Sequence, residues 1–158
     1  MATVEELAAQ IAVLREQIPT LEDLLFSVGI QTWDGGPSVA EGTRFTLMAA
    51  PFPLRVLSVA VSFEYFSLAA SDTVYWKGVL EKGTGPEGFP DIAARTTRPT
   101  GADANGPITA RVPWTWDAAA WSDADLAKGQ LLTVNWTPVG RPAALRLPAL
   151  YTVRYRPL

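Results

Sequence analysis

The sequence predicts a mainly β protein: an antiparallel β-sandwich, jelly-roll-like, preceded by a short N-terminal helix of coiled-coil type. Residues 1–29 place an apolar residue at every third or fourth position, which is the seam spacing of a heptad repeat. Residues 30–158 instead contain about seven or eight short apolar segments separated by glycine- and proline-containing turns. We therefore divide the chain into a heptad helix at 1–29 and a β-sandwich domain at 30–158.

The predicted helix begins at Thr3 and Glu6, which are spaced as a capping box. Pro19 falls outside the seam and removes a backbone hydrogen bond, so we expect a kink there and a short second helix ending near Gly29. Eight apolar residues form the seam: Val4, Leu7, Ile11, Leu14, Ile18, Leu21, Leu25 and Val28.

The seam requires a partner surface, because an isolated helix of this length is marginally stable in water. One interpretation packs the helix on its own domain. The other pairs identical chains in a coiled coil, and the narrow stripe favours it. Valine or isoleucine at the first seam position with leucine at the second favours a two-stranded coiled coil. A globular part that trimerises would override the preference of so short a seam.

The segments that follow residue 38 have the period of two expected of half-buried strands. In the segment 54–68, Leu57, Val59, Val61, Phe63 and Tyr65 share one face. Residues 117–130 are compatible with one or two helical turns before a glycine. The other expected strands are 43–49, 73–83, 91–97, 108–116, 130–140 and 147–158.

The composition narrows the possible functions. The chain has 158 residues, of which 48% are hydrophobic and 18% charged, as in a folded domain. It contains neither cysteine nor histidine, which excludes thiolate chemistry and removes the commonest general base and zinc ligand. A net charge of −3 argues against a nucleic-acid partner, and no apolar stretch reaches membrane-spanning length. We expect no catalytic residues, no metal and no cofactor.

Two local features contain residue types that can bind a ligand: a pair of aspartates and a group of tryptophans. Asp123 and Asp125 form a DxD pattern that can bind a metal, although a solvated turn explains it better. Trp114 and Trp116 share one face of an extended segment, and Trp121 follows soon after. These aromatics either form an exposed platform for a sugar or protein partner, or close the end of the sandwich core.

The chain resembles head decoration (capsid cement) or head fibre proteins of tailed bacteriophages. The resemblance rests on the heptad helix and on three stretches of the sandwich: DTVYWKGVLEKG, LAKGQLLTVNWTPVG and LYTVRYRPL. The second stretch is similar to a strand common in jelly-roll virion proteins, with Gln130 where aspartate is usual. The resemblance implies a non-enzymatic structural protein, made in the host cytoplasm, that sits on the capsid exterior. It implies a homotrimer, with a dimer as the other possibility, that binds the major capsid protein and stabilises the shell. The seam would then hold protomers together or grip the shell.

The alternative interpretation is a receptor- or carbohydrate-binding module of a phage tail or head fibre, with Trp114, Trp116 and Trp121 as the ligand platform. A third class is an enzyme that works with carboxylates. Jelly rolls host all three functions, so the predicted fold alone does not choose between them.

Overall fold

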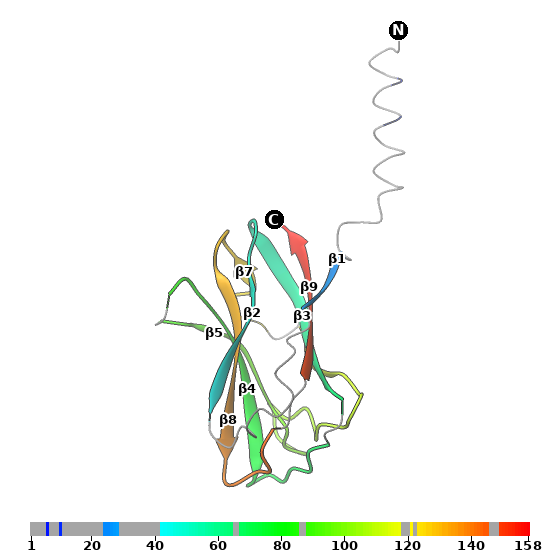
Figure 1. Cartoon of the computed structure of the whole chain (residues 1–158), viewed down its shortest axis with the longest axis vertical. Coiled ribbons are helices and arrows are strands. Elements are labelled where there is room, and N and C mark those ends of the chain that lie inside the picture. Colours follow the sequence, from blue (N-terminus) through cyan, green and yellow to red (C-terminus); the bar gives the residue numbers. More distant parts are fainter. Residues whose placement is uncertain are drawn as a thin grey trace.

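The computed structural model describes residues 6, 10, 24–28, 42–64, 67–85, 88–117, 121, 123–145 and 149–158. The strands in this part of the chain run in the order β1 to β9 (Figure 1). Their bounds are β1 Leu24–Val28, β2 Thr43–Ala49, β3 Leu54–Phe63, β4 Tyr75–Gly83, β5 Asp91–Thr96, β6 Trp114–Asp117, β7 Asp125–Leu126, β8 Leu131–Val139 and β9 Ala149–Pro157.

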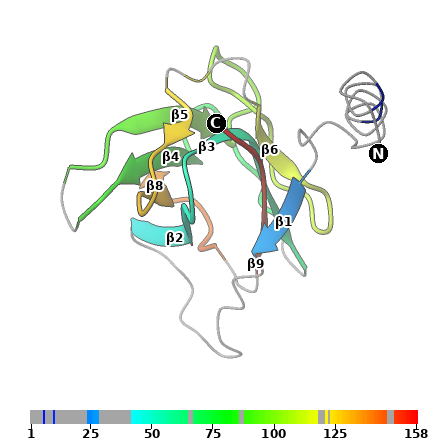
Figure 2. The same cartoon turned by 90° about the horizontal axis from the view of Figure 1, so that it is seen from above.

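These strands form two antiparallel sheets that face each other (Figure 2). Sheet I has the order β1-β9-β3-β6, with the short β7 also paired to β3, and sheet II has the order β2-β8-β4-β5. The pairs are nested: β1 with β9, β2 with β8, β3 with β6 and β4 with β5. This nesting is the strand order of an eight-stranded jelly roll, with β7 as an addition. The prediction of a mainly β, antiparallel protein is confirmed.

Six of the predicted strand segments contain an observed strand, namely β2, β3, β4, β5, β8 and β9, and the predicted segment 54–68 extends beyond the end of β3 at Phe63. In the predicted segment 108–116, Ile108 forms an isolated antiparallel bridge with Leu68, and a continuous strand begins only at Trp114. Arg111 adopts a left-handed backbone with φ of 62° while its amide donates to the Phe63 carbonyl oxygen, at 2.8 Å. Pro113, which cannot donate to a ladder, follows it. The chain therefore turns before β6 begins. Residues 125 and 126, predicted to belong to a helical turn, instead form β7.

The prediction of a second helix ending near Gly29 is wrong for Leu24–Val28, which form β1. This strand pairs with β9 over five register positions, from Leu24 with Tyr155 to Val28 with Tyr151. A short apolar run has no period that separates helix from strand, and here the free edge of β9 supplies the backbone partners. The sandwich therefore takes in β1 and begins before residue 30.

Most of the heptad seam lies outside the described residues. Within 1–23 only Glu6 and Gln10 are described, and both are helical. The coiled coil and the kink at Pro19 stay predictions. The seam residues outside the described part are Val4, Leu7, Ile11, Leu14, Ile18 and Leu21. Leu25 and Val28 lie in β1.

The core lies between the two sheets and follows the alternation of the strands. In β9 every second residue from Ala149 to Tyr155 is buried, as the sequence predicts. In β8 the predicted inward residues Leu132, Val134 and Trp136 are buried, and Thr133 between them is buried as well. In β3 the pattern departs from the prediction because the register with β9 shifts between Val56 and Ser58. This irregularity buries Val56 and leaves Leu57 only half-buried.

Tryptophans join the two sheets through hydrogen bonds as well as packing. The Trp116 indole N–H, from sheet I, donates to the Gly78 carbonyl oxygen of sheet II at 3.0 Å. The Trp136 indole N–H, from sheet II, donates to the Tyr151 hydroxyl of sheet I at 2.8 Å. The ring centroids of Trp116 and Trp136 lie 5.5 Å apart. Both large side chains therefore satisfy their polar atom inside the core.

Candidate functional site

The tryptophans predicted as a ligand platform do not form one. Trp114 is 4% exposed and Trp116 is fully buried. The Trp114 indole N–H donates to the Gly106 carbonyl oxygen at 3.0 Å, and its ring packs on Trp116 and Trp136. The pairing of β6 with β3 turns both side chains into the core. The platform interpretation is therefore wrong for these two residues, and they close the core instead.

Trp121 has a different environment from the other two. Its side chain is half-buried, packs against the core and lines a pocket of about 300 Å³ beside β7. We name this the β7 pocket. The other residues that line it are Arg55, Val56, Leu57, Asp123, Ala124 and Asp125.

Two ion pairs fix the charged groups of the β7 pocket. Arg55 of β3 makes a bidentate pair with Asp125 of β7, with Nε–Oδ1 at 2.5 Å and Nη2–Oδ2 at 2.7 Å. Lys82 of β4 reaches across from sheet II, and its Nζ lies 2.7 Å from Asp123 Oδ2 and donates to the Asp125 carbonyl oxygen at 2.6 Å. Lys82 thereby ties the two sheets together at this end of the sandwich.

These partners also stabilise the charged form of both carboxylates. The hydrogen bond from Arg55 lowers the pKa of Asp125, and the hydrogen bond from Lys82 lowers the pKa of Asp123. The DxD pattern is thus explained by ion pairing. In the described part of the chain, no group of three or more histidine, cysteine, aspartate or glutamate residues is placed to hold a metal ion.

The Lys82 bridge predicts an acid-sensitive contribution to stability. A pKa lowered by folding stabilises the folded chain above the usual aspartate value of 3.8, and the effect is lost as the pH falls through the lower folded values. Lys82→Met should therefore lower the urea midpoint at about pH 7, and the difference from wild type should shrink toward about pH 2. The exposed Lys128 gives the control variant, Lys128→Met. A deficit that is the same at both pH values would contradict this account.

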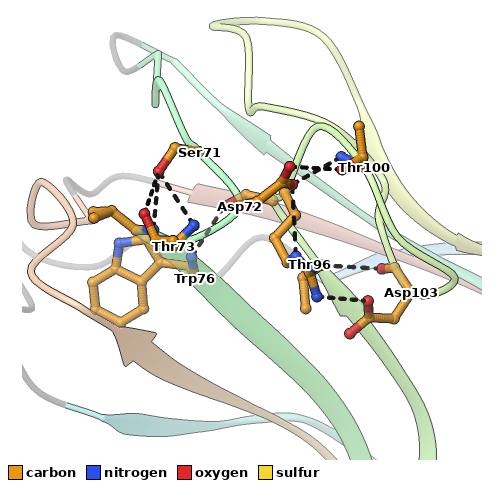
Figure 3. Close-up of polar contacts among 10 residues, drawn as sticks. Ser71, Asp72, Thr73, Trp76, Thr96, Thr100 and Asp103 are labelled. Atoms are coloured by element: carbon orange, nitrogen blue, oxygen red, sulfur yellow. Dashed lines mark hydrogen bonds and ion pairs between the residues drawn. The ribbon is translucent and has the colours of Figure 1, made fainter.

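A second set of polar contacts closes the opposite end of the sandwich, at the start of β4 (Figure 3). The Thr100 hydroxyl donates to Asp72 Oδ2 at 2.6 Å, and this contact lowers the pKa of Asp72. The Arg98 guanidinium lies 3.7 Å from a carboxylate oxygen of Asp72 and 3.7 Å from one of Asp103. Its Cζ lies over the Tyr75 ring, 5.3 Å from the ring centroid. The loop between β3 and β4 is thus held to the loop between β5 and β6.

A third network lies on the outer face of sheet II around Glu81, which is only 4% exposed. Its carboxylate accepts hydrogen bonds from Arg44 Nε at 2.7 Å, Asn135 Nδ2 at 3.2 Å and Thr133 Oγ1 at 3.3 Å. The Arg44 guanidinium in turn stacks over Phe89, at 4.7 Å from the ring centroid. The buried carboxylate is therefore fully partnered, as a buried charge must be.

Sequence reasoning missed Arg55, Lys82 and Glu81. Each partner pair comes from strands far apart in the chain: Arg55 and Asp125 are 70 residues apart, and Arg44 and Glu81 are 37 residues apart. The sequence contains only a weak signal for these residues. Lys82 is a charged residue at an inward position of the segment 73–83, where a charge needs a partner.

Comparison with known proteins identifies no family for this chain. No family model matches the sequence, and no curated protein matches it. A solved structure described as "Structure of infectious bursal disease virus Gx strain" aligns with a TM-score of 0.36 and 14% sequence identity. The alignment covers 84% of this chain and 31% of that chain. Among the described residues, no helix is long and apolar enough to cross a membrane.

Proposed function

We propose that the protein is a non-enzymatic structural component of a virion. It forms a trimer on the outside of a tailed-phage capsid, binds the major capsid protein and stabilises the shell. The nested order of the strands in sheets I and II is the jelly-roll order, which viral capsid domains share with lectin domains and cupins. The observation that selects the virion role among these is the resemblance of the sequence to phage head decoration proteins.

The internal contacts suit a protein that must hold its shape. Indole hydrogen bonds link the two sheets in the core, Lys82 bridges them at one end, and Arg98 ties two loops together at the other. A rigid body presents the same surface in every copy. This is what repeated attachment to a symmetric shell requires, because many weak contacts made together raise the apparent affinity.

Adding the protein back to purified capsids tests the proposal. Particles of the encoding phage that lack this protein are mixed with the full chain and sedimented. We expect saturable binding at a fixed copy number per shell and a higher temperature of capsid rupture. A heat-unfolded sample of the same chain is the control. Protein that stays in the supernatant, or that binds tails rather than heads, would overturn the proposal.

A further inference from the structure

The β7 pocket has features that a role in shell stabilisation does not require. It lies beside β7 and gathers an aromatic side chain, two carboxylates and a guanidinium around about 300 Å³. That volume lies at the lower end of the range for small-molecule sites. The groups come from β3, β7 and the segment before β7, which the ion pairs hold together.

Charges of both signs surround the pocket. Arg55 and Lys82 pair with Asp125 and Asp123, and Arg156, which lies opposite Arg55 in the register of β3 with β9, adds a third positive charge that acts on Asp125. A ligand of either charge would therefore meet groups of its own sign as well as groups of the opposite sign. The electrostatics therefore favour a neutral, polar ligand over an anion or a cation.

The polar groups of the pocket include both donors and acceptors. The Arg55 guanidinium has five N–H donors, of which the bidentate pair with Asp125 uses two. Asp123 binds Lys82 through Oδ2, and its side chain is 63% exposed, so its carboxylate is accessible from solvent. Groups that both donate and accept hydrogen bonds, such as vicinal hydroxyls, match this pairing.

Trp121 adds the remaining element of recognition. It is half-buried, so its body is anchored against the core while part of its surface lines the pocket. A sugar ring presents hydroxyls at its edge and C–H groups on its face, and an aromatic ring packs well against such a face. We propose that the β7 pocket binds a neutral sugar, one or two rings in size, at the end of a glycan.

The pocket is pre-organised for such a ligand. Arg55 and Asp125 already fix one another, and Lys82 holds the segment of Asp123 and Asp125 against sheet II. Little side-chain order remains to be imposed on binding, which lowers its entropic cost. This inference does not rest on the proposed function, because every residue that lines the pocket belongs to one chain.

A glycan array probed with the full-length protein tests the inference. The array carries neutral and acidic glycans, with bacterial polysaccharides and animal glycans in separate sets so that the two sources are distinguished. We expect binding to neutral glycans with a dissociation constant for the free sugar between about 0.1 and 1 mM. Binding to acidic glycans alone, or no binding to any neutral glycan, would overturn the inference.

Three variants locate the site. Trp121→Ala and Asp123→Ala should each lower neutral-glycan binding at least about tenfold, equivalent to about 1.4 kcal/mol. Phe52→Ala changes an exposed aromatic that does not line the pocket, so its binding should equal that of wild type. Asp123 is exposed, so its variant tests the pocket even where Trp121→Ala folds poorly. Wild-type binding by Asp123→Ala and by a folded Trp121→Ala would overturn the assignment.

Discussion

Replacing Trp116 with alanine is expected to lower the free energy of unfolding by about 3–5 kcal/mol. The side chain is fully buried between the sheets, and its indole N–H donates to the Gly78 carbonyl oxygen. The variant therefore opens a large cavity and removes the indole hydrogen bond to the Gly78 carbonyl oxygen. Equilibrium urea unfolding, followed by far-ultraviolet circular dichroism, measures the loss.

Trp121→Ala is the matched control for this prediction. The same atoms are removed, but from a half-buried side chain that lines a pocket rather than the centre of the core. Its loss of stability should be well below that of Trp116→Ala. Equal losses at the two positions would show that Trp116 does not occupy the packed centre described above.

Gly78→Ala is expected to cost about 1–3 kcal/mol through overpacking. A Cβ at this position would lie 2.6 Å from Cζ2 of Trp116 and 3.0 Å from Cζ3 of Trp136. Both indoles are held by hydrogen bonds, so neither ring can move away without breaking one. The steric cost should exceed the gain of about 0.4–1 kcal/mol that Gly→Ala gives at an unstrained site.

Gly85→Ala is the control, because a Cβ there meets nothing within 4 Å and the residue has no positive φ. We expect it to be neutral or slightly stabilising in the same urea experiment. If Gly78→Ala also proved neutral, the close approach of β4 to the two indoles would be wrong.

The strands were predictable because their burial has a simple period. In β9, Tyr151, Val153 and Tyr155 alternate with polar residues, and the structure buries the three aromatic and branched residues as expected. The prediction failed where a local irregularity overrides the period. The register shift next to Leu57 and the left-handed residue Arg111 are two examples, and neither has a sequence signal of its own.

The candidate site was predictable only in part. Trp121 and the DxD pattern are visible in the sequence, but their partners are not. Arg55 and Lys82 reach Asp125 only because β7 pairs with β3 and because sheet II packs on sheet I. Conversely, the spacing of Trp114 and Trp116 places them on one face without saying whether that face is exposed. The nested pairing of the strands determines both which residues reach Asp125 and whether the face of Trp114 and Trp116 is buried.

The heptad seam is best tested without truncation. Removing residues 1–29 would also delete β1, an edge strand of sheet I. Leu14→Gln instead changes a seam position of the heptad, and Val13→Gln changes the neighbouring position outside the seam. If the seam holds the protomers together, only the first variant should weaken assembly. If the sandwich alone drives assembly, neither variant should do so.

The solution mass of the full-length chain tests the central claim most directly. Light scattering on a sizing column, with the protein at micromolar concentration, distinguishes a trimer from a monomer without reference to any capsid. The proposal of a trimeric decoration protein predicts a mass of about 51 kDa, three times the chain mass of 17.1 kDa. A single species of 17.1 kDa would contradict it.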